Sequence, residues 1–213
     1  MAAGEFQSAY RFCIFGDSMK YDSSNNQSEI LPNLLGLQSI EEIGLSEFEG
    51  FLKAEILLTE SLTTRTKFNV SYILKMHKLS LGHLYFFAGK YRDVNLSKSG
   101  FAFPAARFLT ETMIGFENEI LLKLANKYNG KEALVKDIAK VHAELLFIHP
   151  FREGNGRTAR ILANLMCRKQ GYDALKFELI TENVFGNYVI AVQSSADKNY
   201  EKMEEIISFI FSG

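Results

Sequence analysis

The clearest periodic pattern in the chain lies within residues 134–148, where apolar side chains recur every three or four positions. The residues concerned are Leu134, Ile138, Val141, Leu145 and Ile148. Such spacing places all of them on one face of an α-helix. Pro150 cannot continue the helical hydrogen bonding and biases the preceding residue away from helical angles. The pattern therefore predicts a helix that ends at His149, followed by a tight loop.

Weaker helical patterns occupy much of the remaining chain. We expect a first helix capped by Ser46, with Glu49 at the capping-box position, that fades near residues 63–64. A second helix should begin after Asn69 and continue through Gly82 to Tyr85. Further helices are predicted at about 105–128, 155–170, 181–191 and 197–211.

Residues 89–100 interrupt the helical pattern. Residues 94–96 alternate like a short strand before a polar turn, and residues 101–104 would close a hairpin or flap. The predicted fold class is all-α with a small β-hairpin flap. We expect residues 1–29 to form an irregular N-terminal arm and residues 30–213 to form one domain that ends in a helix at 196–213.

Composition narrows the class of protein. The chain has 213 residues, 18 Phe, no Trp and a formal net charge of −1, which argues against a nucleic-acid protein that relies on phosphate neutralisation. Cys13 and Cys167 match neither a disulfide framework nor a metal-ligand spacing, and Cys167 should be an inert core thiol. No apolar run reaches the roughly 18 residues of a membrane span. The N-terminus also lacks signal-peptide features, so we expect a cytoplasmic protein without a membrane partner; secretion without a cleaved signal would leave no mark.

A polar segment at residues 149–160 stands between two apolar helices. Gly154, Asn155 and Gly156 lie where a loop becomes a helix, and the first N–H groups of a helix form an anion site. Arg157 and Arg160 follow at helical spacing, and arginine binds phosphate oxygens bidentately. This combination favours a polyphosphate ligand.

Two further residues of the segment add chemistry. Glu153 precedes the anion site, where a carboxylate is useful if Mg²⁺ lies between it and the phosphates. His149 stands at the rim of the same pocket, and a neutral imidazole can remove a proton from a hydroxyl. The residues therefore predict phosphoryl or nucleotidyl transfer.

Residues 149–160 also match the signature His-Pro-Phe-x-(Asp/Glu)-Gly-Asn-Gly-Arg-x-x-Arg of the Fic (filamentation induced by cAMP) family at every defined position. Residues 86–92, followed by Ser97, Lys98 and Phe103, are similar to the segment that leads into the family's flap. The resemblance covers roughly residues 30–193, with a motif core at about 66–193. It implies a Fic-type helical bundle.

The resemblance implies a protein adenylyltransferase, which moves AMP from ATP to a Tyr, Thr or Ser hydroxyl of a target protein. His149 would be the base, Glu153 would hold Mg²⁺, and Pro150 and Phe151 would shape and anchor the loop. The nucleotide would be bound by Gly154, Asn155, Gly156, Arg157, Arg160 and Tyr188. In this assignment the Asn155 side chain helps to orient the α-phosphate, Arg157 contacts the β-phosphate, Arg160 the γ-phosphate, and Tyr188 lies near the adenine. The target would dock on a flap that includes Ser97, Lys98, Phe101 and Phe103.

Other activities stay open at this point. Doc-like members transfer a phosphate and depart from Gly-Asn-Gly-Arg, so the intact residues 154–157 favour AMP transfer. Another donor or activity, such as phosphocholine, UMP or removal of AMP, is an enzymatic alternative. A nucleotide-binding regulatory module with little turnover is a third, although it would not need both His149 and Glu153. Outside the motif, His77, His83 and His142 are expected to pack or cap, Phe101 and Phe103 could serve only in packing, and Tyr188 could equally be core.

Many Fic proteins are restrained by a helix carrying (Ser/Thr)-x-x-x-Glu-(Gly/Asn). Residues 46–50 place their Glu one position too early, and residues 208–213 have Ser212 where the Glu belongs. We therefore expect restraint by a separate small antitoxin-like partner or by self-association.

Overall fold

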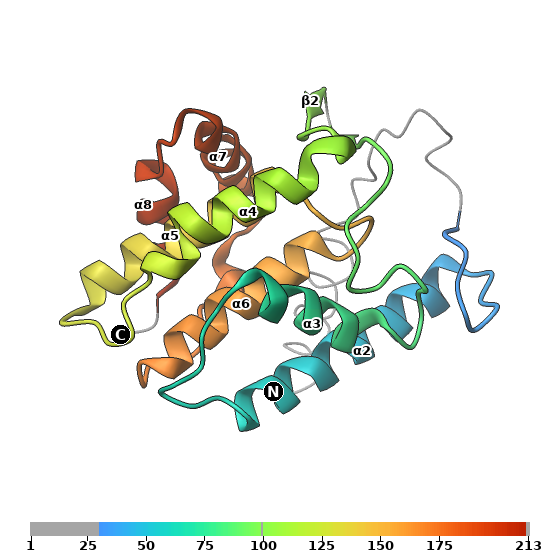
Figure 1. Cartoon of the computed structure of the whole chain (residues 1–213), viewed down its shortest axis with the longest axis horizontal. Coiled ribbons are helices and arrows are strands. Elements are labelled where there is room, and N and C mark those ends of the chain that lie inside the picture. Colours follow the sequence, from blue (N-terminus) through green and yellow to red (C-terminus); the bar gives the residue numbers. More distant parts are fainter. Residues whose placement is uncertain (1–29, 99, 212–213) are drawn as a thin grey trace.

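The computed structural model describes residues 30–98 and 100–211, and the predicted arm at 1–29 lies outside them (Figure 1). The described chain is mostly helical with one two-stranded antiparallel sheet, so the predicted fold class is confirmed. The helices are α2 (Ile40–Glu60), α3 (Val70–Leu81), α4 (Leu109–Glu119), α5 (Lys131–Ile148), α6 (Asn155–Lys169), α7 (Glu182–Gln193) and α8 (Glu201–Ile210). The strands are β1 (Ser97–Lys98) and β2 (Phe101–Ala102). Short 3₁₀ turns lie at Ala106–Phe108, Leu121–Lys123, Phe177–Leu179 and Ser194–Asp197.

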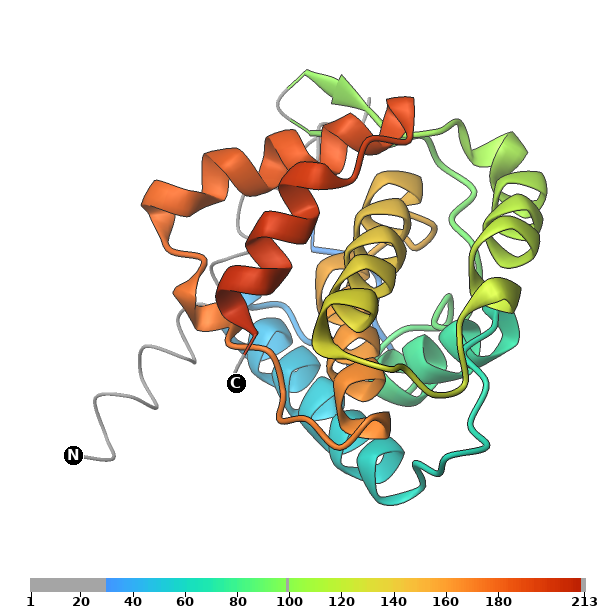
Figure 2. The same ribbon diagram turned by 90° about the vertical axis from the view of Figure 1, so that its left-hand side faces the viewer.

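Helices α5 and α6 form the centre of the molecule. Helix α5 packs against α4, α6, α7 and α8, while α6 also contacts α2 and α3. Figure 2 shows α5 and α6 between the α7–α8 pair on one side and α4 on the other. The loop that joins these two helices therefore starts and ends in the best-packed part of the fold.

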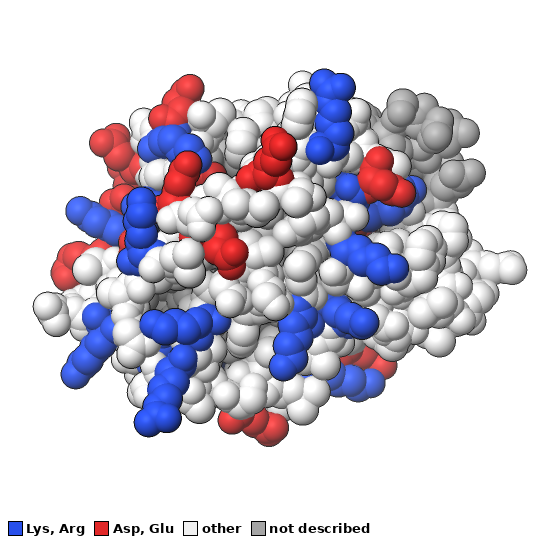
Figure 3. Space-filling model, viewed as in Figure 1, with Lys and Arg blue, Asp and Glu red and all other residues white. Residues whose placement is uncertain are grey.

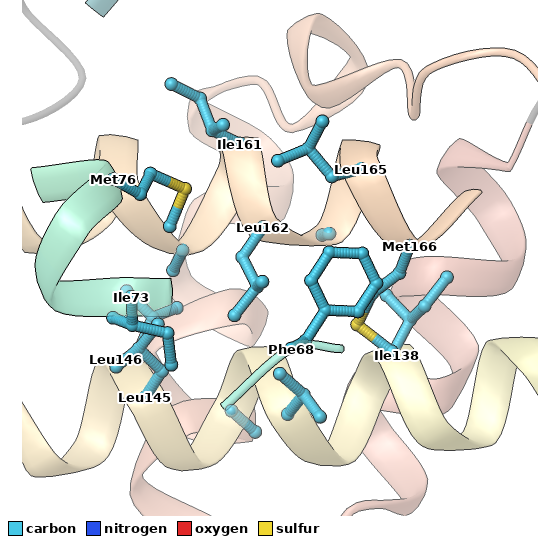
Figure 4. Packing of buried hydrophobic residues seen from close by; sticks show 14 of the residues in the cluster. Phe68, Ile73, Met76, Ile138, Leu145, Leu146, Ile161, Leu162, Leu165 and Met166 are labelled. Carbon is cyan, nitrogen blue, oxygen red and sulfur yellow. The ribbon is translucent and has the colours of Figure 1, made fainter. Parts of the chain in front are cut away.

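The central helices meet through close apolar packing. The predicted stripe of α5 is buried, with Leu134 and Ile138 both 0% exposed. Figure 4 shows Leu162 of α6 in the space between α6 and α5, with Ile73 of α3 nearby. Cys167 is fully buried in this core, and burial raises the pKa of its thiol to about 12. The prediction of an inert core thiol is consistent with this environment.

The surface carries charges of both signs. Figure 3 shows Lys and Arg interspersed with Asp and Glu over the face in view. Within residues 30–98 and 100–211, no helix combines the length and apolar character needed to cross a bilayer.

The first predicted helix begins earlier than expected. Helix α2 starts at Ile40, and its cap is Ser39, whose Oγ accepts a hydrogen bond from the N–H of Glu42 at 3.3 Å. The Ser-x-x-Glu pattern occurs at residues 39–42 and again at 46–49, and the prediction chose the second one. Ser46 lies inside the helix, and its Oγ is 3.1 Å from Nε2 of His83.

Two helices are shorter than predicted. Helix α3 begins after Asn69 as expected, but it ends at Leu81 with Gly82 as its C-cap. The predicted helix at 105–128 is a 3₁₀ turn, then α4, then a second 3₁₀ turn after a backbone break at Ile120 (φ −124°, ψ −62°). Apolar periodicity does not distinguish a continuous helix from a helix followed by tight turns.

The flap and the C-terminus also differ in their boundaries. The predicted hairpin is present, but its first strand is β1, directly after residues 94–96, and Ser97 pairs with Ala102 across it. The last helix starts at Glu201 and not near residue 197, because Lys198 adopts a left-handed backbone (φ 56°) that interrupts helical bonding.

The cap of α3 provides a test of these boundaries. Asn69 Oδ1 accepts a hydrogen bond from the N–H of Tyr72 at 2.8 Å. Replacing Asn69 by Ala should lower the free energy of unfolding by about 1 kcal/mol, as measured by urea denaturation. Asn69→Asp keeps the acceptor and should be close to wild type, whereas equal losses in both variants would contradict the assignment.

Candidate active site

The loop at residues 149–154 connects the two central helices. Helix α5 ends at Ile148, and the C-cap His149 has a left-handed backbone with φ 52° and ψ 57°. A residue with a Cβ atom adopts this conformation only at an energetic cost, so surrounding contacts must hold it. The predicted base is therefore placed by its surroundings and not by local preference.

A buried arginine that precedes the flap supplies such contacts. Arg92 is 3% exposed; its Nε donates to the carbonyl of His149 at 2.8 Å, and its backbone N–H donates to the carbonyl of Pro150 at 2.8 Å. Its Nη1 donates to the carbonyl of Val94 at 2.7 Å and its Nη2 to that of Pro104 at 2.6 Å. One guanidinium thus joins the end of α5 to both ends of the flap.

The imidazole of His149 has a defined tautomer. Its Nδ1 lies 2.9 Å from the carbonyl oxygen of Leu146, which can only accept, so Nδ1 carries the proton. The lone pair is then on Nε2, the atom a general base would use. The ring of Phe103 stacks on the imidazole with centroids 4.0 Å apart and an interplanar angle of 21°. The flap therefore contacts the predicted base directly.

The two flap phenylalanines connect the hairpin to α5. Phe101 meets Phe103 edge-on with centroids 5.5 Å apart, and it also lies 6.0 Å from the ring of Phe147. Ser97 and Lys98 form the opposite strand and are partly exposed. Phe101 and Phe103 thus have a packing role, and target docking on this flap stays a prediction.

Asn155 closes the loop onto itself. The N–H of Phe151 donates to Oδ1 of Asn155 at 2.8 Å, and Nδ2 of Asn155 donates to the carbonyl of Phe151 at 2.7 Å. Asn155 is 1% exposed and Phe151 is fully buried. The Asn155 amide thus fixes the loop, and the expected contact with an α-phosphate would require these bonds to open.

Gly154 is required by its backbone and by its neighbours. It has φ 78°, and a Cβ atom built on it would lie 2.8 Å from Cζ of Phe51 and 3.0 Å from Cδ1 of Leu81. Helices α2 and α3 therefore press directly on the turn. The N–H of Thr158 donates to the carbonyl of Gly154 at 2.9 Å, which begins the bonding of α6. The first turn, including Gly156, is where the anion site is predicted.

His77 of α3 packs against the loop and hydrogen-bonds to it. Its ring stacks on Phe151 with centroids 3.8 Å apart and 9° between planes. Its Nε2 is 2.9 Å from the carbonyl oxygen of Glu153, so Nε2 carries the proton, and its Nδ1 accepts from the N–H of Gly89 at 2.8 Å. Burial lowers the pKa of His77 to about 4. The ring is neutral and structural, as predicted.

Arg157 pairs both with Glu153 and with Glu47, a residue that the sequence analysis did not single out. Nη2 of Arg157 donates to Oε2 of Glu47 at 2.7 Å and to Oε1 of Glu153 at 3.2 Å. The guanidinium also lies over the ring of Phe51, 4.7 Å from its centroid. Tyr85 donates its hydroxyl proton to Oε1 of Glu47 at 2.6 Å. Two carboxylates therefore share one cation beside the predicted phosphate site.

A sequence signal for Glu47 does exist. The buried residues of α2 include Ile43, Glu47, Phe51, Ala54 and Leu58, which recur at helical spacing. An acidic residue within an apolar stripe indicates a buried ionic partner. The signal was hidden because the helix was expected to start only at Ser46.

The remaining nucleotide candidates differ in their surroundings. Arg160 is partly buried, and its guanidinium lies 5.9 Å from the ring centroid of Phe177. Tyr188 is 7% exposed, and its hydroxyl donates to Nε2 of His142 at 2.6 Å, since Nδ1 of His142 donates to a carbonyl. Burial lowers the pKa of His142 to about 3, so this pair is neutral. Tyr188 is thus a core residue, and an adenine contact stays a prediction.

Glu49 is not directed toward the site. Its side chain is 55% exposed and lies 3.7 Å from Nζ of Lys53. The described residues also hold no cluster of three or more His, Cys, Asp or Glu side chains suited to a metal ion. A Mg²⁺ ion here would therefore depend on Glu153, whose Oε1 also accepts from the N–H of Gly154 at 2.7 Å, together with ligand oxygens.

Comparison with known proteins identifies relatives of this chain. The sequence model of the Fic/DOC family matches residues 67–167. The chain is 31% identical over 140 residues to protein adenylyltransferase Fic of Nematostella vectensis, covering 64% of this chain and 30% of that protein. It is 28% identical over 166 residues to protein adenylyltransferase VbhT of Bartonella schoenbuchensis, covering 72% and 33%. The chain thus spans about a third of the length of these curated relatives.

Solved structures share the fold. The N-terminal FIC domain of Bep8 from Bartonella sp. 1-1C superimposes with a TM-score of 0.71 at 20% identity, covering 91% of this chain and 96% of that one. BepC of Bartonella tribocorum with bound AMPPNP gives a TM-score of 0.70 at 18% identity, covering 92% and 97%.

Two of the buried histidines, His77 and His142, predict how stability depends on pH. An unfolded imidazole takes up a proton near pH 6.5, whereas His77 and His142 stay neutral in the fold to about pH 4 and 3. The unfolded state then binds more protons in this window, so their contribution is complete above pH 6.5 and is lost as the pH falls toward 4. The midpoint of thermal unfolding should fall accordingly. His77→Gln removes one titrating ring and should lose less between pH 7 and 4.5 than wild type; an equal loss would argue against this role.

The Arg92 contacts predict a second outcome. Arg92→Lys keeps the charge, but one ammonium cannot reach three carbonyls held by a planar guanidinium. We expect faster amide hydrogen exchange across residues 96–103 and a loss of about 1–3 kcal/mol of stability, because buried acceptors lose their donors. The matched control is Arg107→Lys. Arg107 follows the flap in the chain, but its guanidinium lies over the ring of Phe108, so this variant should leave hydrogen exchange in the flap unchanged.

Proposed function

We propose that the protein, whose residues 67–167 match the sequence model of the Fic/DOC family, transfers AMP from ATP to a Tyr, Thr or Ser hydroxyl of a target protein. The observation that carries the proposal is the 2.9 Å contact between Nδ1 of His149 and the carbonyl oxygen of Leu146, which assigns the ring proton of the neutral imidazole to Nδ1. This leaves the lone pair on Nε2, in the same loop that leads into the N-terminus of α6. The names of the relatives, which are protein adenylyltransferases, support AMP as the transferred group.

The proposed reaction is an attack of the target hydroxyl on the α-phosphorus of ATP. Nε2 of His149 accepts the hydroxyl proton as the hydroxyl oxygen bonds to the α-phosphorus. The bond from the α-phosphorus to the oxygen bridging the β-phosphate breaks, and pyrophosphate leaves. The clamp of Arg92 on the backbone of His149 would keep the base in position during this step.

The phosphates would lie at the start of α6. Backbone N–H groups of Asn155 and Gly156 would face them with the positive end of the helix dipole, and Gly154, with its φ of 78° and no side chain, would let the phosphates approach the turn. We assign Arg157 to the β-phosphate and Arg160 to the γ-phosphate. Tyr188 is assigned to the wall behind the adenine, since its hydroxyl is already bonded to His142.

The residues present fit a Mg²⁺ ion. Glu153 is a single carboxylate beside the proposed phosphate site, and Mg²⁺ is commonly held by one or two carboxylates plus substrate phosphate oxygens. When bound, the ion would neutralise phosphate charge. Glu153 is oriented for this by the N–H of Gly154 and by Arg157.

The flap would hold the target. The hairpin that contains Ser97, Lys98 and Phe101 is only two strands wide, so an extended target segment could add a strand at its edge. Phe103 would then place the target hydroxyl close to His149, on whose ring it stacks.

Restraint of the activity is proposed to come from outside the chain. Glu49 is exposed and paired with Lys53, which fits the expectation of a separate small antitoxin-like partner or of self-association. We assign the protein to the cytoplasm, with secretion as an effector kept as the alternative.

The proposal is tested with labelled ATP, Mg²⁺ and host lysate. Wild-type protein should label a target, and His149→Ala should lose labelling by several orders of magnitude while nucleotide binding survives, because only the base is removed. His83→Ala, which replaces an exposed imidazole outside the loop, is the control for loss of a histidine ring. Mass spectrometry should find added AMP; an added phosphate, or labelling that persists without His149, would overturn the proposal.

A further inference from the structure

We propose that Glu47 is a positioning residue of this site, and this inference rests on the proposed function. Glu47 orients Arg157 and neutralises most of its charge. Arg157 can then hold Glu153 in place without fully neutralising it, so that Glu153 can bind a divalent cation. Glu47 lies on α2, which precedes the segment matched by the family model.

The contact distances support an unequal sharing of the cation. Nη2 of Arg157 is 2.7 Å from Oε2 of Glu47 but 3.2 Å from Oε1 of Glu153. The side chains of Glu47 and Arg157 are each 10% exposed, whereas that of Glu153 is 23% exposed. The Glu47–Arg157 pair, whose carboxylate lies outside the motif, is therefore shorter and more buried than the Glu153–Arg157 pair.

Charge explains why this sharing matters. A buried guanidinium and one carboxylate form a neutral pair in which the attraction is strong because little water screens it. If Arg157 had only Glu153 as a carboxylate partner, it would neutralise the group that the metal needs. With Glu47 present, the three side chains carry a net charge of −1, which suits a divalent cation bridging to phosphate.

Glu47 is itself held in one orientation. Its Oε1 accepts the hydroxyl proton of Tyr85 at 2.6 Å, and its neighbour on the helix face, Phe51, covers the guanidinium of Arg157. A carboxylate that acted as a removable brake would have to leave when nucleotide binds. If Glu47 left, Tyr85 would lose its acceptor and the buried guanidinium of Arg157 would lose its nearer carboxylate, so a fixed positioning role is the one that the packing supports.

The test compares two matched variants on α2. Glu47→Gln removes the charge at the site, while Glu55→Gln removes the charge of a similar α2–α6 pair, in which Oε1 of Glu55 is 2.8 Å from Nη1 of Arg168. Binding of a non-hydrolysable ATP analogue is measured by calorimetry in Mg²⁺ and in EDTA. We expect Glu47→Gln to weaken binding in Mg²⁺ by about 10–100-fold, the range typical of outer-shell partners of metal ligands, and to change binding in EDTA by a much smaller factor, through Arg157 alone. Glu55→Gln should match wild type in both.

Further outcomes decide between the roles. Tyr85→Phe keeps the Glu47 carboxylate and should shift Mg²⁺-dependent binding in the same direction by a smaller factor, which tests the inference even if Glu47→Gln fails to fold. Higher AMP transfer by Glu47→Gln would identify a brake and overturn the proposal. Unchanged Mg²⁺ dependence in both Glu47→Gln and Tyr85→Phe would overturn it as well. If the wild-type protein transfers no AMP, the proposed function fails, and the binding comparison still tests Glu47 on its own.

Discussion

The geometry of the candidate site depends on one buried cation, the guanidinium of Arg92. Its planar donors reach three carbonyl groups that belong to the end of α5 and to the two ends of the flap. Because a buried guanidinium must satisfy its N–H groups within the protein, these segments cannot separate without a large loss of hydrogen bonding. The left-handed backbone of His149 is stable in this context. The arrangement of base and flap is thus a property of the fold.

The phosphate side of the loop is built by a different set of contacts. His77 stacks on the ring of Phe151 and donates a hydrogen bond to the carbonyl of Glu153. Phe51 and Leu81 leave no room for a side chain at Gly154. These contacts come from α2 and α3. A short polar motif therefore keeps its shape because well-packed helices surround it.

Much of this could be predicted from the sequence, for physical reasons that differ between elements. The stripe from Leu134 to Ile148 and the stop at Pro150 predict α5 because apolar period and backbone chemistry agree. The start of α2 was wrong because two capping patterns compete, and only packing selects Ser39. Glu47 was missed for a related reason, since its role depends on a partner 110 positions away in the chain. Local periodicity indicates that Glu47 needs a buried partner, but it does not identify that partner as Arg157.

The position of Glu47 bears on what counts as the minimal unit of this site. The segment matched by the family model begins at residue 67, whereas α2 lies at Ile40–Glu60. A fragment starting at residue 67 would keep every residue of the signature yet lack Glu47, the nearer of the two carboxylates paired with Arg157, and the ring of Phe51 over its guanidinium. It would also expose the apolar surface that α2 covers. The boundary of the segment matched by the family model and the boundary of the candidate site therefore fall at different places in this protein.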